Sequence, residues 1–389
     1  MTKHYLTNSQ FDAEVFKCLN CKSKPCMSAC PVNCSPQEFI QHSKNKNYKE
    51  AINAICKNNP MGHTCGLICP DNFCMKACLR GKIDHPINIP LIQATLIHKY
   101  RKINLNNNLK KQNGKKIAIV GAGPAGMASA WFLIQQGYQI KIFEKSEKVG
   151  GALNLIPSYR LPYDVIEDDW NYIKSIGDGE IEFNSQINNP LELFDKGFSG
   201  VIMAIGEQNS IDLGIEGEEH IITYYDYLKN PSDYKNNSKV AVIGGGNVAC
   251  DCALTAKKLG AIDVSMFIRR KIFDMKISKT EITELLNNQI DLVTTTRITK
   301  VEKNNKSDIY TCTTQLTDNG YQDIKNSTIK RCGFDLIIKA IGSKSDKHID
   351  HPKIIYAGDC KNGGSTIVEA VASGIDSAKM LHKKIMEET

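Results

Sequence analysis

The alternation of apolar and polar residues divides the chain into three segments. Residues 1–112 show no strand–turn–helix pattern, although Phe39–Cys56 and Ile89–Tyr100 have the apolar spacing of helices. From Lys116 onward, the run KIAIVGAGPAGMASAWFLIQQGYQIKIFEK predicts a strand, a glycine turn, a helix and a second strand. A second copy starts at Lys239, as KVAVIGGGNVACDCALTAKKLGAIDVSMFIRR. Two such units in one chain predict two dinucleotide ligands.

The ends and borders of these segments add less specific information. The polar stretch NLNNNLKKQNG at residues 104–114 predicts a linker after the first segment. The N-terminus, MTKHYLTNSQ, lacks the apolar stretch of a secretory signal, and no apolar run reaches the roughly 18 residues of a membrane helix. With 389 residues, of which 41% are hydrophobic and 23% charged, we expect a cytosolic protein of two or three domains.

Cysteine and charge are both concentrated unevenly in the first segment. Ten of the 15 cysteines precede residue 80, and in a reducing compartment such clusters serve as metal ligands or redox groups. Residues 1–112 contain 16 Lys/Arg and 6 Asp/Glu, whereas the remainder contains 33 and 36. Because the lysines are scattered, with little aromatic interleaving, they argue against nucleic-acid binding. They would instead offset the negative charge of thiolate-bound clusters.

The cysteines form two runs with different spacing. The first is C-x2-C-x4-C-x3-C-P, from Cys18 to Pro31, and the second is C-x3-C-P-x3-C-x3-C, from Cys65 to Cys78. Zinc sites of four cysteines usually use two separated short pairs. A closing C-P, and a fourth cysteine that binds the other cluster, are features of iron–sulfur runs. The spacing therefore favours iron–sulfur clusters, with zinc as the alternative.

The first glycine turn has the G-x-G-x-x-G spacing of a dinucleotide site. Gly121 follows the apolar strand Ile117–Val120, and a helix follows the turn, so that the helix N-terminus faces a pyrophosphate. Glu144 lies 18 residues after Gly126, at the end of the next strand, where a carboxylate accepts from a ribose hydroxyl. The predicted contacts of this site are Gly121, Ala122, Gly123, Pro124, Ala125, Gly126, Glu144, Lys145, Gly151 and Ala152.

The end of the chain indicates which nucleotide occupies the first site. Tyr356-Ala-Gly-Asp359, followed by a glycine turn and a helix, resembles the closing FAD motif of flavoproteins with two dinucleotide sites. In that motif the aspartate holds the ribityl chain and the helix N-terminus faces the flavin. The alternative is an ordinary helix cap, which Asp and Ser often supply. The predicted FAD contacts here are Gly358, Asp359, Ser365, Thr366 and Val368.

The second glycine turn differs from the first in the charge that follows it. Strand Val264–Ile268 ends in Arg269 and Arg270, with Lys276 beyond, and not in a carboxylate. Arginine matches a 2′-phosphate by charge and geometry, so NADPH is favoured over NADH. A solvated arginine pair on a surface loop is the alternative. The predicted contacts in the turn after strand Val240–Ile243 are Gly244, Gly245, Gly246, Asn247 and Val248.

Two cysteines in this second unit raise the alternative of a disulfide reductase. Cys250 and Cys252 form C-x-C on a helix, where the two side chains point apart. The C-x-x-C of a redox dithiol is absent from this position. The spacing therefore argues against a disulfide reductase.

Nearly the whole chain resembles the electron-input half of dihydropyrimidine dehydrogenase and the bacterial subunit that supplies this half separately. The small subunit of glutamate synthase is a close relative. The stretches that carry the resemblance are CLNCKSKPCMSACP, CGLICPDNFCMKAC, PINIPLIQ, GAGPAG, IPSYRLPYDV, GGGNVACD, AIGS and AGD.

The resemblance implies an α/β protein with a helical N-terminal domain and two Rossmann-like domains, the second inserted in the first. The expected divisions are a [4Fe-4S] domain at residues 1–112, an FAD-binding domain at 113–236 and 347–389, and an NADPH-binding domain at 237–346.

The resemblance also implies two [4Fe-4S] clusters and their ligands. One cluster would be bound by Cys18, Cys21, Cys26 and Gln93, and the other by Cys30, Cys69, Cys74 and Cys78. The Cys69–Cys74 interval is one residue shorter than in the family, which leaves Cys65 as an alternative ligand, and Gln93 has the alternative role of an ordinary polar helix residue. Arg160 would contact FAD, and the NADPH contacts would include Ala340, Ile341, Gly342 and Ser343.

Together these features predict an oxidoreductase that takes electrons from NADPH through FAD and two clusters to a partner's redox centre. Because the cofactors carry the chemistry, no acid–base residue is assigned. The chain contains neither an FMN-binding (β/α)8 barrel nor a glutamine-hydrolysing module, so we expect a separate catalytic subunit, without nucleic-acid or membrane partners. The alternatives are a glutamate synthase small subunit, a ferredoxin-linked NADPH:acceptor oxidoreductase, and a non-enzymatic cluster-bearing scaffold.

Overall fold

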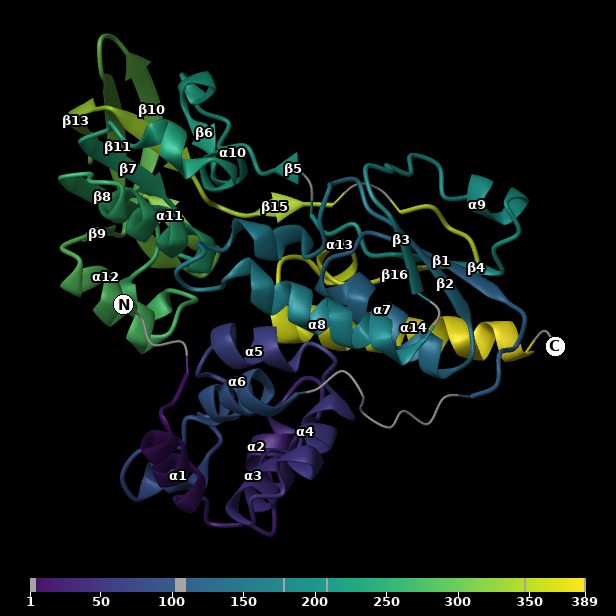
Figure 1. Cartoon of the computed structure of the whole chain (residues 1–389). Helices are drawn as coiled ribbons and strands as arrows, with labels where there is room; N and C mark the ends of the chain where they lie inside the picture. Colours follow the sequence, from purple (N-terminus) through teal and green to yellow (C-terminus); the bar gives the residue numbers. More distant parts are fainter. Residues whose placement is uncertain (1–4, 102–109, 178, 208, 346–347, 388–389) are drawn as a thin grey trace. The chain divides into compact units, whose positions relative to one another are not determined.

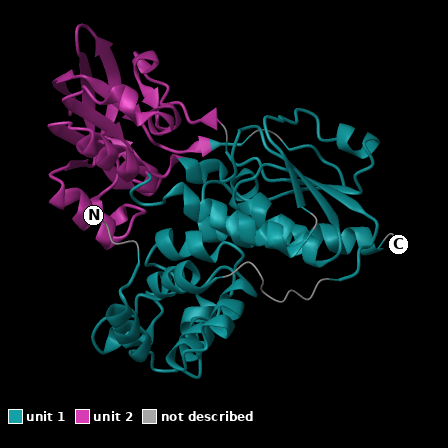
Figure 2. Cartoon of the chain, viewed as in Figure 1, with its two compact units in different colours: residues 1–154, 158–208, 344–389 teal, residues 155–157, 209–343 magenta. Residues whose placement is uncertain are grey.

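The computed structural model describes residues 5–101, 110–177, 179–207, 209–345 and 348–387 (Figure 1). The chain forms two compact units, which Figure 2 shows in different colours. The first unit comprises residues 1–154, 158–208 and 344–389, and the second comprises residues 155–157 and 209–343. Of the expected linker at 104–114, residues 104–109 lie outside the described residues.

Helices are the regular elements of the cysteine-rich segment over its described residues 5–101. They are α1 (Asn8–Phe16), α2 (Pro25–Ser28), α3 (Pro36–Lys44), α4 (Tyr48–Cys56), α5 (Gly62–Ile68), the 3-10 turn η1 (Leu79–Lys82) and α6 (Ile89–Tyr100). A capping box between Thr7 and Gln10 starts α1. The helix predicted over Ile89–Tyr100 is α6 with the same bounds, and Phe39–Cys56 is covered by α3 and α4 with a turn between them.

The core of these helices is packed without room for larger residues. The side chains of Ile52, Ile55 and Ile92 are completely buried. A Cβ atom on Gly66 of α5 would lie 2.6 Å from the backbone nitrogen of Ala94 in α6. Helices α5 and α6 therefore meet backbone to backbone, and a shift of one displaces the other.

The first unit also contains a parallel sheet of five strands in the order β16-β4-β1-β2-β3. The strands are β1 (Lys116–Val120), β2 (Gln139–Phe143), β3 (Gly179–Glu182), β4 (Gly200–Met203) and β16 (Ile354–Tyr356). Its helices are α7 (Pro124–Gln135), α8 (Tyr163–Ile176), the short α9 (Glu192–Asp195) and α13 (Asp359–Asn362), and the long α14 (Ile367–Glu387), with the 3-10 turn η2 (Gly151–Leu155). Helix α14 packs on α7, where Ser129 donates a hydrogen bond to the Gly374 carbonyl.

The second unit is built on another five-stranded parallel sheet, in the order β6-β14-β7-β8-β9. Its strands are β6 (Ile222–Thr223), β7 (Lys239–Ile243), β8 (Asp263–Ile268), β9 (Asp291–Thr294) and β14 (Leu336–Lys339). Its helices include α10 (Tyr224–Lys229), α11 (Asn247–Lys258) and α12 (Lys279–Asn287), with 3-10 turns η3 (Glu218–His220), η4 (Pro231–Tyr234) and η5 (Ile272–Asp274). The short strands β5 (Asn209–Ser210) and β15 (Ser343–Lys344) pair with each other.

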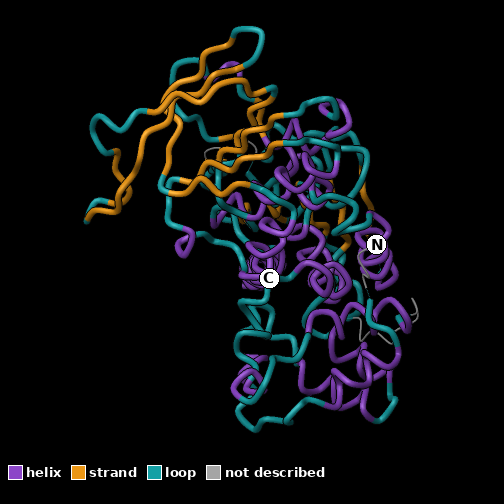
Figure 3. The backbone as a smooth tube through the Cα atoms, turned by 90° about the vertical axis from the view of Figure 1, so that its left-hand side faces the viewer, coloured by secondary structure: helices purple, strands orange, loops and turns teal. Residues whose placement is uncertain are grey.

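An antiparallel sheet of four strands follows β9 in the same unit. Its strands, drawn in orange with the others in Figure 3, are β10 (Thr296–Lys303), β11 (Ser307–Thr317), β12 (Gly320–Asp323) and β13 (Ile329–Phe334). Ile298, Ile309 and Phe334 pack with Ile243 and Phe267 of the parallel sheet into one buried cluster. This sheet is absent from the sequence-based expectations.

The protein is thus of the mixed α/β class that the sequence predicts. The division into four sequence ranges stays a prediction, because the helical segment and the first parallel sheet belong to one compact unit. Within the described ranges, no helix combines the length and the apolar character needed to cross a bilayer.

Candidate functional site

The first cysteine run surrounds a small cavity. Cys18, Cys21, Cys26 and Cys78 line it, together with mainly apolar neighbours and the two cations Lys24 and Arg80. Lys24 has a φ of 46°, which turns the chain sharply just before helix α2 begins at Pro25. Cys21 before this turn and Cys26 after it line the same cavity. Burial raises the pKa of the Cys26 thiol to about 11. A thiol of this kind is mostly protonated near neutral pH, and binding of its thiolate to a metal centre would release the proton.

The second run brings further thiols together. Cys65 and Cys69 lie one turn apart at the end of α5, and their mutual hydrogen bond, together with burial, raises the pKa of Cys69 well above its ordinary value. Burial and the nearby Cys30 raise the pKa of Cys74 to about 12. Cys30 and Cys74 thus lie near Cys69, with Cys65 beside it. The three cysteines expected on the first cluster line one cavity.

The remaining expected ligand of each cluster is placed differently. Among the described residues that line the first cavity, Cys78 is present and Gln93 is not. Gln93 is 7% exposed; its Nε2 donates to the Gly62 carbonyl over 2.7 Å, and its Oε1 lies 3.7 Å from Sγ of Cys34. Within the described residues, no three Cys, His, Asp or Glu side chains converge closely enough for a single metal ion.

The glycine turn after β1 provides a backbone surface for a pyrophosphate. Gly121 has a φ of 102°, and a Cβ there would lie 2.4 Å from the Ala204 carbonyl oxygen. At Gly123, in contrast, the nearest atom to an added Cβ would be the Cα of Gly151, 3.9 Å away. The two outer glycines of the motif are needed by the fold itself, whereas Gly123 leaves open space beside the start of α7. This space fits the phosphates of FAD.

Glu144 lies beside this turn at the end of β2. It is 4% exposed and accepts hydrogen bonds from the backbone nitrogens of Ala122, over 2.7 Å, and of Ser146, over 2.9 Å. The carboxylate therefore holds the turn in place at the predicted position for ribose. Arg160 lies half-buried in the chain between η2 and α8, in the same unit.

The C-terminal motif places a carboxylate at the entrance of α14. Burial raises the pKa of Asp359, whose Oδ1 accepts a hydrogen bond of 2.6 Å from the Ser365 hydroxyl. Burial, and then the charge of Asp359, also raise the pKa of Glu207, which lies beside Gly364. Helix α14 begins at Ile367, and the Thr366 nitrogen donates to the Glu369 side chain. Short helix α13 intervenes, so that Asp359 itself does not cap α14.

A cavity of about 520 Å3 lies beside this motif and is bordered by the residue that follows the first cysteine run. It is lined by Pro31, directly behind Cys30, and by Gly364 and Ser365 at the start of α14. The other lining residues are Lys361, Asn362, Glu369, Ala372, Ser373 and Asp376. The end of the cysteine run and the segment predicted to face a flavin thus border the same space.

The second glycine turn has the same construction in the second unit. Gly244 has a φ of 141°, and a Cβ there would lie 2.2 Å from the Ala340 carbonyl oxygen, whereas Gly246 faces open space. Helix α11 begins directly afterwards at Asn247. The predicted contacts at 340–343 follow β14, and the Ser343 hydroxyl lies 2.7 Å from that of Tyr224.

The arginine loop after β8 is fixed by the antiparallel sheet. The Arg269 carbonyl accepts a hydrogen bond of 2.6 Å from the Thr314 hydroxyl, and the Arg270 carbonyl accepts from the Thr295 nitrogen over 3.0 Å. The side chain of Arg269 is exposed and that of Arg270 is partly buried. The pair is accessible to a phosphate group, and its backbone is held by residues that the nucleotide motif does not include.

Comparison with known proteins identifies the family. The family model "Pyridine nucleotide-disulphide oxidoreductase" matches residues 115–374, and that of dihydropyrimidine dehydrogenase domain II, 4Fe-4S cluster, matches residues 1–105. The homolog of the NAD-dependent dihydropyrimidine dehydrogenase subunit PreT from Salmonella typhi is 30% identical over 96% of this chain and 94% of its own. The chain belongs to the PreT family.

One further relative matches part of its own length, and a solved structure shares the fold. The NADPH-Fe(3+) oxidoreductase subunit beta of Geobacter sulfurreducens is 31% identical over 72% of this chain and 43% of its own. FprA of Mycobacterium tuberculosis, solved with NADPH, shares the fold with a TM-score of 0.63 at 15% identity, over 70% of this chain and 85% of its own. This chain is an electron-input subunit of dihydropyrimidine dehydrogenase type, an iron–sulfur flavoprotein that uses NAD(P)H.

Proposed function

We propose that the chain delivers electrons from NADPH, through FAD and two [4Fe-4S] clusters, to a separate cytosolic catalytic subunit that reduces uracil or thymine. When bound, FAD accepts a hydride from the nicotinamide and releases single electrons, which the clusters conduct. The chain's own residues bind and orient these groups. In this proposal the two parallel sheets are Rossmann-like domains, the first for FAD and the second for NADPH.

The observation that carries the proposal is the cavity shared by the two cofactor motifs. Pro31 follows the proposed ligand Cys30, and Ser365 precedes the helix predicted to face the flavin, yet both line one cavity. A flavin held by Asp359 and Ser365 would therefore lie next to a cluster held by Cys30. Adjacent redox groups in one compact unit support electron transfer between them.

The proposed residues divide according to the group that they bind. Cys18, Cys21 and Cys26, with Gln93, would hold one cluster, and Cys30, Cys69, Cys74 and Cys78 the other. Cys18, Cys21 and Cys26 line one cavity, which Cys78 also borders, and Cys69 lies near Cys30 and Cys74. The lysine and arginine beside the first cavity, Lys24 and Arg80, would offset the negative charge of a thiolate-bound cluster.

The choice of NADPH rests on the arginine loop. Arg269 and Arg270 stand where an acidic residue would select NADH, and their backbone is held by Thr314 and Thr295. The PreT relatives carry the name NAD-dependent, whereas the Geobacter relative is named for NADPH. The arginine pair of this chain supports NADPH, the coenzyme in the name of the Geobacter relative.

Purification with a candidate partner tests the function. The chain, co-expressed with an FMN-barrel subunit of dihydropyrimidine dehydrogenase type, is expected to contain iron and FAD and to reduce uracil or thymine with NADPH. Glutamate formation with a glutamate synthase large subunit would replace this function with the alternative. If the chain binds clusters but NADPH does not bleach the absorbance of its flavin, the chain is a scaffold and the proposal fails.

A further inference from the structure

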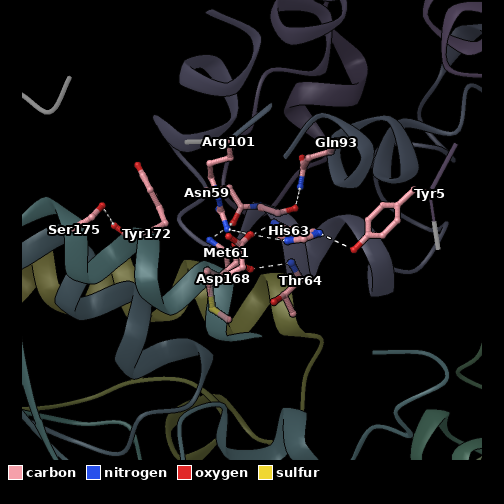
Figure 4. A network of polar contacts seen from close by, with 12 residues as sticks. Tyr5, Asn59, Met61, His63, Thr64, Gln93, Arg101, Asp168, Tyr172 and Ser175 are labelled. Atoms are coloured by element: carbon pink, nitrogen blue, oxygen red, sulfur yellow. Dashed lines mark hydrogen bonds and ion pairs between the residues drawn. The ribbon is translucent and has the colours of Figure 1, made fainter. Parts of the chain in front are cut away.

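We infer that Asp169 and Arg101 are positioning residues, through which the flavin-binding fold holds the two helices that carry cluster ligands. Both residues lie in the first unit, Asp169 on α8 and Arg101 directly after α6. The network around them is drawn in Figure 4. The inference rests on the proposed function and concerns how the cluster ligands are held.

Asp169 caps a helix that is more than a hundred residues away in sequence. The N-cap residue of α5, Met61, makes no capping hydrogen bond with its side chain. Instead, Oδ1 of Asp169 accepts from the His63 nitrogen over 3.2 Å, and Oδ2 accepts from the Thr64 nitrogen over 2.8 Å. Asp169 has no exposed surface. A buried carboxylate at this place satisfies free backbone donors and interacts favourably with the helix dipole.

Arg101 neutralises this buried carboxylate. Its side chain is 2% exposed, and Nη1 lies 2.8 Å from Oδ1 of Asp169, while Nη2 contacts Asp168. Burial alone would lower the pKa of Arg101, but the charge of Asp169 more than offsets this, so the net pKa is raised and the guanidinium stays charged. It also lies over the ring of Tyr172, 5.1 Å from the centroid. Arg101 thereby fixes the end of α6 to α8.

The second aspartate is a more exposed part of the same network. Asp168 is 42% exposed at its side chain and contacts Nδ1 of His63 over 2.7 Å. His63 in turn shares a hydrogen bond of 2.9 Å with the Tyr5 hydroxyl, and Tyr5 stacks on His98 with ring centroids 3.9 Å apart. Burial raises the pKa of Asp168, but the hydrogen bond with His63 and the charge of Arg101 lower it by more. The net pKa of Asp168 is therefore below its ordinary value.

The contacts of Asp169 and Arg101 affect the proposed cluster ligands through helices α5 and α6. Helix α5 begins at Gly62, whose carbonyl accepts from Nε2 of Gln93 on α6, and it ends at Ile68, directly before Cys69. A Cβ on Gly62 would lie 2.6 Å from Cδ1 of Ile97, so the two helices cannot slide independently. Displacement of the α5 N-terminus therefore moves both Gln93 and Cys69, one proposed ligand of each cluster.

The test compares Asp169→Asn with a matched control on the same helix. Asn keeps the shape but removes the charge that faces Arg101 and the helix N-terminus. Glu167→Gln removes an equal charge from an exposed position of α8. In the holoprotein, Asp169→Asn is expected to alter the EPR line shape of the photoreduced clusters and to shift the midpoint potential of at least one cluster. The flavin potential should stay unchanged, and iron loss to a chelator should become about tenfold faster.

The control defines the outcomes that decide the inference. Glu167→Gln should match the wild type in every readout. Wild-type EPR spectra and cluster potentials in Asp169→Asn would overturn the inference. If Asp169→Asn retains no iron, Arg101→Lys is tested in its place. This variant keeps the positive charge but loses the contact of the guanidinium with both aspartates. Wild-type cluster signals in Arg101→Lys would equally overturn the inference. Photoreduction bypasses NADPH, so a wild type that fails to oxidise NADPH contradicts the proposed function without affecting this test.

Discussion

Individual cysteines show most directly how the proposed electron route is divided. Cys30 ends the first run but lies near Cys65 and Cys74 of the second, whereas Cys26, four residues earlier, lines the first cavity. In the proposed arrangement a single turn of chain would serve two clusters, as expected when a fourth cysteine binds the other cluster.

This division predicts different losses from two similar substitutions. Cys18→Ser should remove the EPR signal of the cluster bound by the first run, and Cys30→Ser should remove the other, because each cluster loses a different thiolate. EPR of the photoreduced holoprotein, with iron counted per chain, measures this. Loss of the same signal in both variants would contradict the division.

The arginine pair predicts a change in coenzyme preference. Arg269→Ala with Arg270→Ala should raise the KM for NADPH about tenfold or more, since a hydrogen bond to a charged group contributes about 1.5–3 kcal/mol. The KM for NADH should change little, because NADH has no 2′-phosphate. Steady-state reduction of an artificial acceptor with either coenzyme measures both values. Equal changes in the KM for NADH and the KM for NADPH would show that the arginine pair does not bind the 2′-phosphate.

At the scale of elements, the sequence predicts well where local patterns decide the structure. The predicted strand Ile117–Val120 lies in β1, and Val264–Ile268 lies in β8, because apolar runs bounded by glycine or charge are local signals. The four-stranded sheet β10–β13 is absent from the predictions, although two of its turns are local: Lys303 pairs with Ser307, and Thr317 pairs with Gly320. The contact of Arg101 with Asp169 has no local signal, because 68 residues separate them.

The contact between α7 and α14 carries a prediction about FAD. A Cβ on Gly374 would lie 2.2 Å from the Ala125 carbonyl oxygen, so Gly374→Val must push α14 away from α7. We expect a loss of about 1–3 kcal/mol in the free energy of unfolding. FAD content should fall as well, because α7 follows the phosphate turn and α14 follows Ser365. Chemical denaturation and the ratio of flavin to protein absorbance measure the two effects.

A nearby substitution serves as the control for this contact. Met380→Ala changes an exposed residue of α14 and should leave FAD content and stability near the wild-type values. Full FAD occupancy in Gly374→Val would show that the packing of these helices does not position the flavin site.

For the whole molecule, the fold combines a cysteine-rich helical segment with two parallel sheets, each of which carries a glycine turn. The cysteine-rich helices and the first parallel sheet form one compact unit, within which Pro31 and the start of α14 border one cavity. The second parallel sheet carries the other glycine turn and the arginine loop. This organisation suits a chain that collects electrons at one site and conducts them to a partner.

The central claim is that electrons reach the partner through the clusters and not directly from the flavin. The most direct test uses the complex of this chain with an FMN-barrel subunit, comparing the wild type with Cys26→Ser. The wild-type complex should reduce uracil with NADPH, whereas Cys26→Ser should keep NADPH-driven dye reduction at the flavin and lose uracil reduction. Uracil reduction at the wild-type rate by the Cys26→Ser complex would contradict the claim.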